Sequence, residues 1–174
     1  MAHWLSRLLR HRLLDEGDAQ RALDPAALLR IERLVAASEA RHSGQIRVCV
    51  EAGLPLSFLR RGATARDRAV AMFGKLRVWD TEHDNGVLIY LLLAEHAIEI
   101  VADRAIARQV DAAAWAAIAA QMRDAFRGGD FEAGLERAIE TVDGLLVRHF
   151  PRRAGQGGTA ADYPNELPDR PEIR

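Results

Sequence analysis

Apolar and polar residues alternate along the chain with two different periods, which separate predicted helices from predicted strands. Apolar residues at helical spacing predict amphipathic helices. These segments are residues 4–14, 25–41 and 65–77, the stretch between Asp111 and Gly128, and the stretch between Asp130 and Pro151. Runs of β-branched or continuous apolar residues are typical of strands. These runs are Gln45 to Glu51, Val87 to Leu93, and Ala97 to Ala102.

The lengths of the connections predict how the strands pair. Only Ala94, Glu95 and His96 join the second strand to the third, which permits a hairpin and not a crossover, so these strands should be antiparallel neighbours. The first strand reaches the second through a helix, so a parallel right-handed crossover is expected. The pattern therefore predicts an α/β fold.

The two ends of the chain differ from its middle. We predict an N-terminal amphipathic helical segment over residues 1–23, an α/β domain over residues 24–151, and an extended or loose tail over residues 152–174, which is rich in glycine and proline. In the first segment Trp4, Leu5, Leu8 and Leu9 have arginines between them. This pattern fits a helix that rests on a membrane surface or a short helix packed on the domain. Three arginines are few for an electrostatic anchor, which favours packing.

Composition and charge restrict the classes of function. The chain has 174 residues, enough for one domain, and its 24 basic and 25 acidic residues nearly cancel, so we expect no nucleic-acid partner. Cys49 is the single cysteine and lies in an apolar run, which predicts a core residue and a reducing compartment. No secretory signal is visible, and the run from Val87 to Ala94 is too short for a membrane helix. We therefore expect a soluble cytoplasmic protein.

Chain connectivity also predicts that acidic residues gather at one edge of the sheet. The hairpin must place Val87 beside Ala102, so the loop 80–85 and Asp103 share an edge. The parallel crossover brings the start of the first strand, and the helix before it, to the same edge. The acidic residues that converge there are Glu39, Asp80, Glu82, Asp84 and Asp103.

A cluster of carboxylates needs a compensating cation, because like charges repel at close range. Hard divalent ions prefer oxygen ligands, and Asn85 and loop carbonyls could complete their coordination. One interpretation is therefore a Ca²⁺ or Mg²⁺ site. The alternative is a solvated loop whose charges pair with Arg77, Arg104 and Lys75.

Other chemistries have weaker support. The histidines are scattered without zinc-ligand spacing, no serine lies in a nucleophile elbow, and Gly128-Gly129 begins no phosphate-binding pattern. Trp79 and Trp115 are expected in the core rather than as stacking platforms.

The segment from Trp79 to Tyr90, WDTEHDNGVLIY, resembles the signature of the cytosolic bacterial-type branch of the TPM domain family. Further similar pieces are Ser38-Glu39, His42-Ser43-Gly44, residues 99–104, Gly129-Asp130-Phe131, His149-Phe150-Pro151 and residues 165–169. The resemblance implies a three-layer α/β/α sandwich around a small mixed sheet that contains an antiparallel hairpin. It also implies Ca²⁺ or Mg²⁺ near the sheet edge, with Asp80, Glu82 and Asp103 as ligands, Asn85 as a turn and oxygen donor, and Glu39 as an outer carboxylate. The chain departs from the family pattern at Ala105, where glycine is expected; a positive φ there would strain alanine.

Two hypotheses of function follow. The first is a non-catalytic module that binds a divalent cation and has an accessory or protein-maintenance role with a protein partner. The second is a weak metal-dependent acid phosphatase, in which Asp80 or Asp103 holds the ion, Glu39 or Glu82 acts as base, and Arg104 stabilises phosphate. The sequence offers this second hypothesis no distinct nucleophile, so we favour the first.

Overall fold

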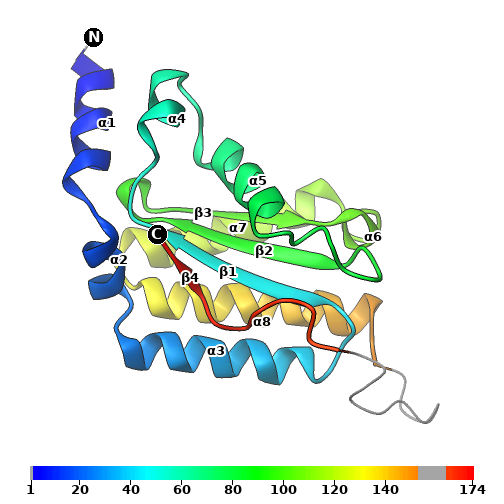
Figure 1. Ribbon diagram of the computed structural model, residues 1–174. Coiled ribbons are helices and arrows are strands. Elements are labelled where there is room, and N and C mark those ends of the chain that lie inside the picture. Colours follow the sequence, from blue (N-terminus) through cyan, green and yellow to red (C-terminus); the bar gives the residue numbers. More distant parts are fainter. Residues whose placement is uncertain (1, 153–163) are drawn as a thin grey trace.

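A four-stranded sheet in the order β3-β2-β1-β4 forms the middle layer of the computed structural model, which describes residues 2–152 and 164–174 (Figure 1). Its strands are β1 (Gln45–Glu51), β2 (Gly86–Leu92), β3 (Ala97–Ala102) and β4 (Glu172–Ile173). β1 pairs with β2 in parallel and β2 with β3 antiparallel. Both pairings are those that the connection lengths predict.

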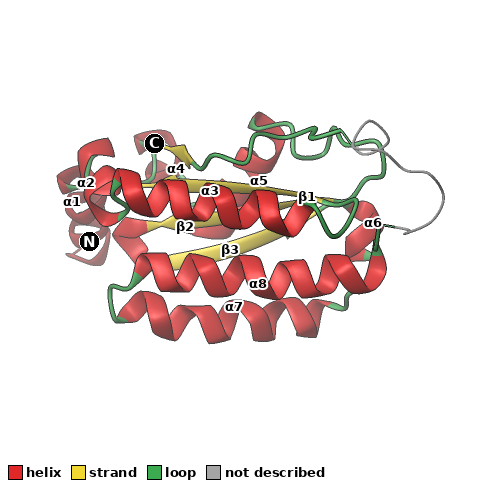
Figure 2. Ribbon diagram, turned by 90° about the horizontal axis from the view of Figure 1, so that it is seen from below, coloured by secondary structure: helices red, strands yellow, loops and turns green. Residues whose placement is uncertain are grey.

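Helices cover both faces of this sheet, so the fold is the expected α/β/α sandwich (Figures 1 and 2). One face packs against α3 (Pro25–Glu39), α7 (Ala112–Arg127) and α8 (Phe131–His149), and the other against α4 (Leu56–Arg60) and α5 (Ala65–Lys75). Side chains alternate between the two cores because successive strand residues point to opposite faces. The buried residues Val87, Ile89 and Leu91 enter one core, and Leu88, Tyr90 and Leu92 enter the other.

Short polar side chains set the beginnings of the helices. Asp24 precedes Pro25 and accepts a hydrogen bond from the Ala27 N–H at 2.7 Å, which satisfies one of the unpaired donors of the first turn. Thr64 forms a capping box with Asp67 at the start of α5. Asp130 accepts from the Ala133 N–H at 3.1 Å and begins α8.

Several short elements have too few residues for a periodic signal, and their bounds were not predicted. They are α2 (Glu16–Ala22), α4, the 3₁₀ turn η1 (Leu93–Glu95), α6 (Arg104–Ala107) and β4. β4 shows that the last part of the expected extended or loose tail, residues 164–174, returns to the sheet. Cys49 lies opposite Glu172, and Arg47 donates to the carbonyls of Pro168, at 2.9 Å, and Arg170. The remaining part of that tail, 153–163, lies outside the described residues.

One side of the N-terminal helix α1 (Ala2–Leu13) packs on the domain. Arg7 donates to Glu95 at 2.8 Å. His11 is buried between two partners: its Nε2 lies 3.0 Å from Glu95 Oε1, and its Nδ1 accepts the Leu54 N–H at 3.0 Å. The side chain of Trp4 lies outside the described part. None of the helices in residues 2–152 and 164–174 combines the length and apolar character needed to cross a bilayer.

Two single-residue expectations have opposite outcomes. Cys49 is fully buried, as predicted, and burial raises the pKa of its thiol to about 12, so it remains a protonated core residue. Trp79 was expected in the core, but 49% of it is exposed. The reason is the end of α5 at Lys75: Arg77 takes a positive φ of 56°, and the reversed chain directs Val78 inward and Trp79 outward.

Candidate functional site

The strand register brings three separate segments to one edge of the sheet. Ile46 lies opposite Val87, and Val87 lies opposite Ala102. The Asp103 N–H donates to the Gly86 carbonyl at 2.9 Å and extends the antiparallel ladder by one residue. The starts of β1 and β2 and the end of β3 therefore meet, as connectivity predicts, and we call this the acidic edge.

Asn85 and Asp103 are the inward-facing polar residues of the acidic edge. Asn85 is fully buried and Asp103 is 5% exposed. Asn85 donates from Nδ2 to Ser43 Oγ at 3.3 Å, while its Oδ1 has no hydrogen-bond partner among the described residues. Asp103 accepts the Arg104 N–H on Oδ1 at 2.7 Å, and its Oδ2 likewise has no partner within residues 2–152 and 164–174. A buried polar atom without a partner costs about 1–3 kcal/mol, so these two oxygen atoms need a positive or donating group.

The loop before β2 adopts a shape that places Asn85 inward. Asp84 has a positive φ of 51°, which aspartate tolerates better than most residues, and its carbonyl accepts the Ala105 N–H at 2.9 Å. Gly86 is required by close approach, because a Cβ there would lie 2.1 Å from the Val78 carbonyl oxygen. Ala105 lies in α6 and is not among the residues with positive φ. Alanine in place of the expected glycine therefore introduces no strain.

The other loop carboxylates face solvent, as the alternative interpretation of an ion-paired loop expects. Asp80 pairs with Arg77, and Asp84 pairs with Arg104 at 2.7 Å. Glu82 is exposed, and its N–H donates to Glu166 at 2.8 Å. Within residues 2–152 and 164–174, no three His, Cys, Asp or Glu side chains are grouped so that they could hold a metal ion together.

Glu39 lies behind the edge, at the end of α3. It is 5% exposed and accepts the Ile46 N–H on Oε1 at 2.7 Å. Burial, with smaller contributions from Asp169 and Glu166, raises the pKa of Glu39 to about 8. Its carboxyl group is therefore mostly protonated at neutral pH, and it ties the end of α3 to the start of β1.

Two buried polar side chains of β1 were not considered from the sequence. Gln45 is 2% exposed and accepts the N–H groups of Glu166, at 2.9 Å, and Leu167, at 3.1 Å. These contacts hold the returning tail against the acidic edge. The available signal was the polar character of Gln45 and Arg47 within an otherwise apolar strand, which indicates side chains with specific partners.

A second buried polar cluster joins α3 to α8 close to this edge. Ser38 Oγ lies 2.9 Å from His42 Nε2 and 2.8 Å from Asp143 Oδ1. His42 Nδ1 lies 3.0 Å from the Gly44 carbonyl, and burial lowers the pKa of His42 to about 4. In a catalytic triad the carboxylate binds the imidazole N–H. Here a backbone carbonyl has that position, so the cluster has a structural role.

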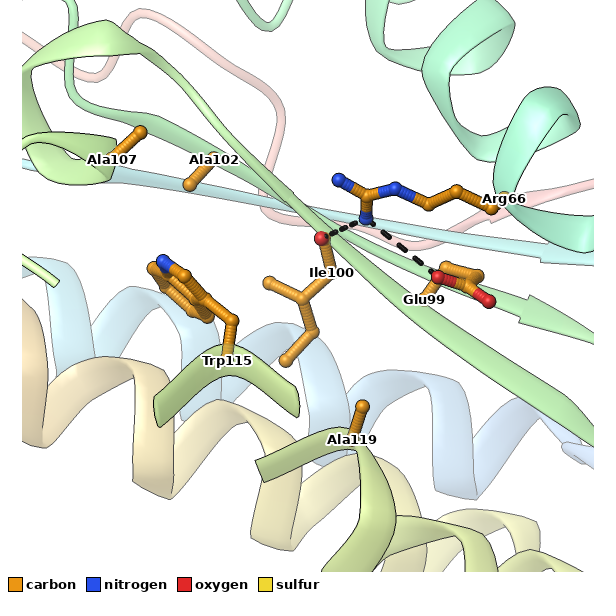
Figure 3. Close-up of a pocket in the computed structure, with 7 residues that line it drawn as sticks. All are labelled: Arg66, Glu99, Ile100, Ala102, Ala107, Trp115 and Ala119. Atoms are coloured by element: carbon orange, nitrogen blue, oxygen red, sulfur yellow. Dashed lines mark hydrogen bonds and ion pairs between the residues drawn. The ribbon is translucent and has the colours of Figure 1, made fainter. Parts of the chain in front are cut away.

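A groove of about 310 Å³ lies on the open side of β3 and reaches Ala102, the residue before Asp103 (Figure 3). Arg66 reaches over it from α5, donates to the Ile100 carbonyl and lies 3.6 Å from Glu99. Trp115 forms part of its other wall and is half-buried rather than fully in the core. Arg66 thus covers an outward-facing backbone carbonyl of the edge strand, which protects that strand from pairing with another chain.

Comparison with known proteins agrees with this fold. The family model of the TPM domain matches residues 17–145. The solution structure of the BA42 protein from the psychrophilic bacterium Bizionia argentinensis is similar with a TM-score of 0.71 and 27% identity, over 86% of this chain and 94% of that chain. The N-terminal domain of a protein from P. gingivalis has the same fold, with a TM-score of 0.61 and 16% identity, over 80% of this chain and 94% of that chain. No curated protein matches the chain.

Proposed function

The chain belongs to the TPM domain family, and from this premise we propose that it is a divalent-cation-binding module whose ion, Ca²⁺ or Mg²⁺, binds at the acidic edge. The supporting observation is the two buried oxygen atoms, Asn85 Oδ1 and Asp103 Oδ2, that lack hydrogen-bond partners in the part of the chain that the structure describes. A hard cation binds such oxygen atoms and compensates the buried charge of Asp103.

The donor set suits Ca²⁺ or Mg²⁺ better than a transition metal. Asp103 would supply the charged oxygen and Asn85 a neutral one, and Mg²⁺ in particular needs only one or two carboxylates when water completes its shell. Asp80, Glu82 and Asp84 would act from the surface, where they make the approach to the edge more negative. Glu39, which lies behind the edge and whose raised pKa keeps it mostly protonated at neutral pH, remains the proposed outer carboxyl group.

An accessory role with a protein partner fits this edge better than catalysis. Phosphoryl transfer needs cationic groups that are free to hold phosphate, whereas Arg77 and Arg104 are engaged by Asp80 and Asp84. One observation favours the phosphatase as a second candidate. Arg104 Nε lies 3.8 Å from Asp103 Oδ1, so an ion on Asp103 would have a cationic neighbour.

Thermal unfolding in CaCl₂ or MgCl₂, against KCl of equal ionic strength, tests the cation site. The wild type should gain melting temperature, because a ligand that binds only the folded state stabilises it. Asp103→Asn removes the charge and should abolish the gain, while asparagine still caps α6. Asp84→Asn, a matched change at the surface, should keep it. A wild type without response, or Asp103→Asn responding fully, contradicts the proposal.

Hydrolysis of p-nitrophenyl phosphate separates the two candidate functions. Turnover that requires Mg²⁺ or Ca²⁺ and disappears in Asp103→Asn would establish the phosphatase. Equal background rates in the wild type and the variant, together with a cation-dependent melting temperature, would support the accessory module.

A further inference from the structure

The inner side of α1 is fixed to the domain by specific contacts. Arg7 donates to Glu95 at 2.8 Å and to the Ala63 carbonyl at 2.7 Å, and His11 is 3% exposed. A Cβ on Gly53 would lie 2.5 Å from the His11 carbonyl oxygen, so the two backbones are in close contact. These contacts determine which side of the 12-residue helix faces away from the protein.

The outer side of α1 carries a row of exposed leucines. Leu5, Leu9 and Leu13 are 51%, 59% and 77% exposed. Residues four apart lie on the same side of a helix. This row is offset by two residues from Arg7 and His11, about 200° around the axis. The leucines therefore point directly away from the packed side.

Arginines border the leucine row on both sides. At about 100° per residue, Arg10 and Arg12 fall on opposite margins of Leu9 and Leu13, and both are exposed. The sequence of α1 contains no acidic residue. An exposed apolar centre between cationic margins is the pattern of helices that lie in the interface of an anionic bilayer.

We propose that α1 docks the protein on an anionic lipid surface, with Leu5, Leu9 and Leu13 between the headgroups as the main anchor and Arg10 and Arg12 at the lipid phosphates. Arg7 is engaged by the domain, and the two remaining arginines add to an attachment that they are too few to provide alone. The surface goes beyond the cation site and is independent of it. α1 also lies outside residues 17–145, which the family model matches, so the proposal concerns this chain rather than its family.

Shape and charge favour lipid over other occupants. Figures 1 and 2 place α1 at one end of the molecule, outside the three layers, so its outer side is convex, and a fluid bilayer accepts a convex helix. Two copies joined through their α1 helices would bring Arg10 and Arg12 of each copy near those of the other. α1 has no acidic residue to pair with them, and like charges repel.

Co-sedimentation of the full chain with vesicles tests the proposal, in EDTA so that the acidic edge does not contribute. The wild type should bind vesicles of phosphatidylcholine with phosphatidylglycerol and bind pure phosphatidylcholine far less. Leu5→Ser, Leu9→Ser and Leu13→Ser combined should lower the partition coefficient about ten-fold or more, because three apolar side chains are lost from the bound face. Leu29→Ser with Val70→Ser, at residues 45% and 52% exposed on other helices, should not.

The arginines are tested in the same assay. Arg10→Gln with Arg12→Gln should lower binding several-fold, and Arg33→Gln with Arg108→Gln, at exposed arginines elsewhere, should leave it unchanged. Added salt should weaken wild-type binding by screening. All these side chains are exposed, and circular dichroism verifies that each variant folds. No binding to anionic vesicles, equal losses in target and control variants, or a leucine-dependent dimer in place of vesicle binding would overturn the proposal.

Discussion

The two ends of β1 and β2 each bury a carboxylate, and they satisfy it in different ways. At one end Glu51, 4% exposed, accepts Arg68 at 2.8 and 2.5 Å and the Tyr90 hydroxyl at 2.6 Å. At the other end Asp103 is equally buried, but its Oδ2 has no partner among the described residues. Arg68 supplies the counter-charge for Glu51, whereas no charged group within residues 2–152 and 164–174 lies against Asp103 Oδ2.

This difference distinguishes Glu51, whose charge is compensated within the protein, from Asp103, the proposed cation ligand. A buried ion pair with good geometry and additional hydrogen bonds compensates the cost of removing its charges from water. Glu51 meets those conditions with Arg68 and Tyr90. The exposed side chain of Arg104 lies 3.8 Å from Asp103 Oδ1, so Oδ2 would gain a counter-charge only from the proposed cation.

The largest expected effect comes from removing the internal counter-charge. Arg68→Ala leaves Glu51 buried without its cation, and we expect a loss of about 3–5 kcal/mol in the free energy of unfolding. Urea denaturation measures this loss. Arg68→Met combined with Glu51→Gln should recover most of the stability. A loss below about 1 kcal/mol would mean that groups other than Arg68 compensate the charge of Glu51, which would contradict the contrast between Glu51 and Asp103.

The same chemical change should have opposite signs at the two ends. Glu51→Gln deprives Arg68 of its charged partner and should cost about 2–3 kcal/mol. Asp103→Asn in EDTA removes a buried charge whose ion pair with the exposed Arg104 is long, at 3.8 Å, keeps the helix cap and should stabilise by about 1 kcal/mol. Chemical denaturation of both variants side by side checks this prediction. If both variants are destabilised alike, Asp103 is as well compensated as Glu51.

Glu39 makes stability depend on pH. Its folded pKa of about 8 exceeds its ordinary value of 4.5, so the folded state holds the proton more tightly. The resulting stabilisation is fully present below pH 4.5 and is lost as pH rises towards 8. His42 has the opposite effect on stability, because its folded pKa of about 4 lies below its ordinary value of 6.5. Its contribution is present above pH 6.5 and is lost as pH falls from 6.5 to 4.

Above pH 6.5, therefore, Glu39 acts without opposition from His42. Between pH 6.5 and 8 the wild type should lose about 2 kcal/mol, at about 1.4 kcal/mol per pH unit. Glu39→Gln keeps an oxygen for the Ile46 N–H and should flatten this slope. Denaturation midpoints measured in EDTA between pH 6.5 and 8 give the slope of stability against pH for both proteins. A slope that persists in Glu39→Gln assigns the effect to another group.

The smallest effects are expected at the surface of the acidic edge. Asp80→Asn and Asp84→Asn break exposed pairs with Arg77 and Arg104, and each should change stability by less than about 0.5 kcal/mol. The same denaturation assay suffices. A change above about 1 kcal/mol would show that these carboxylates belong to the buried part of the edge.

The sequence could predict the frame of the site because connection lengths allow few topologies. The four residues between β2 and β3, 93–96, require a hairpin, and the hairpin places Asp103 beside the start of β2. The sequence could not show which carboxylates turn inward. That choice depends on the positive φ of Asp84 and on the arginines that Asp80 and Asp84 find, and neither has a periodic signal.

Longer-range pairings were equally hidden. β4 has two residues, and its partner strand is more than a hundred residues earlier in the chain. α1 shows a different limit. Spacing predicted an amphipathic helix but not which side packs. That side is set by contacts distant in sequence: His11 with Glu95 and the Leu54 N–H, and Leu8 with the core beneath it.

The length of β1 has a consequence for how the molecule works in a charged environment. From Gln45 to Glu51 the strand spans about 20 Å, with α1 at one pole and the acidic edge at the other. Ions in physiological solution screen charges beyond about 8 Å. An anionic lipid surface in contact with α1 would therefore leave the electrostatic potential at the acidic edge almost unchanged. The proposed lipid attachment and the proposed cation binding should therefore respond independently to substitutions at opposite poles of the molecule.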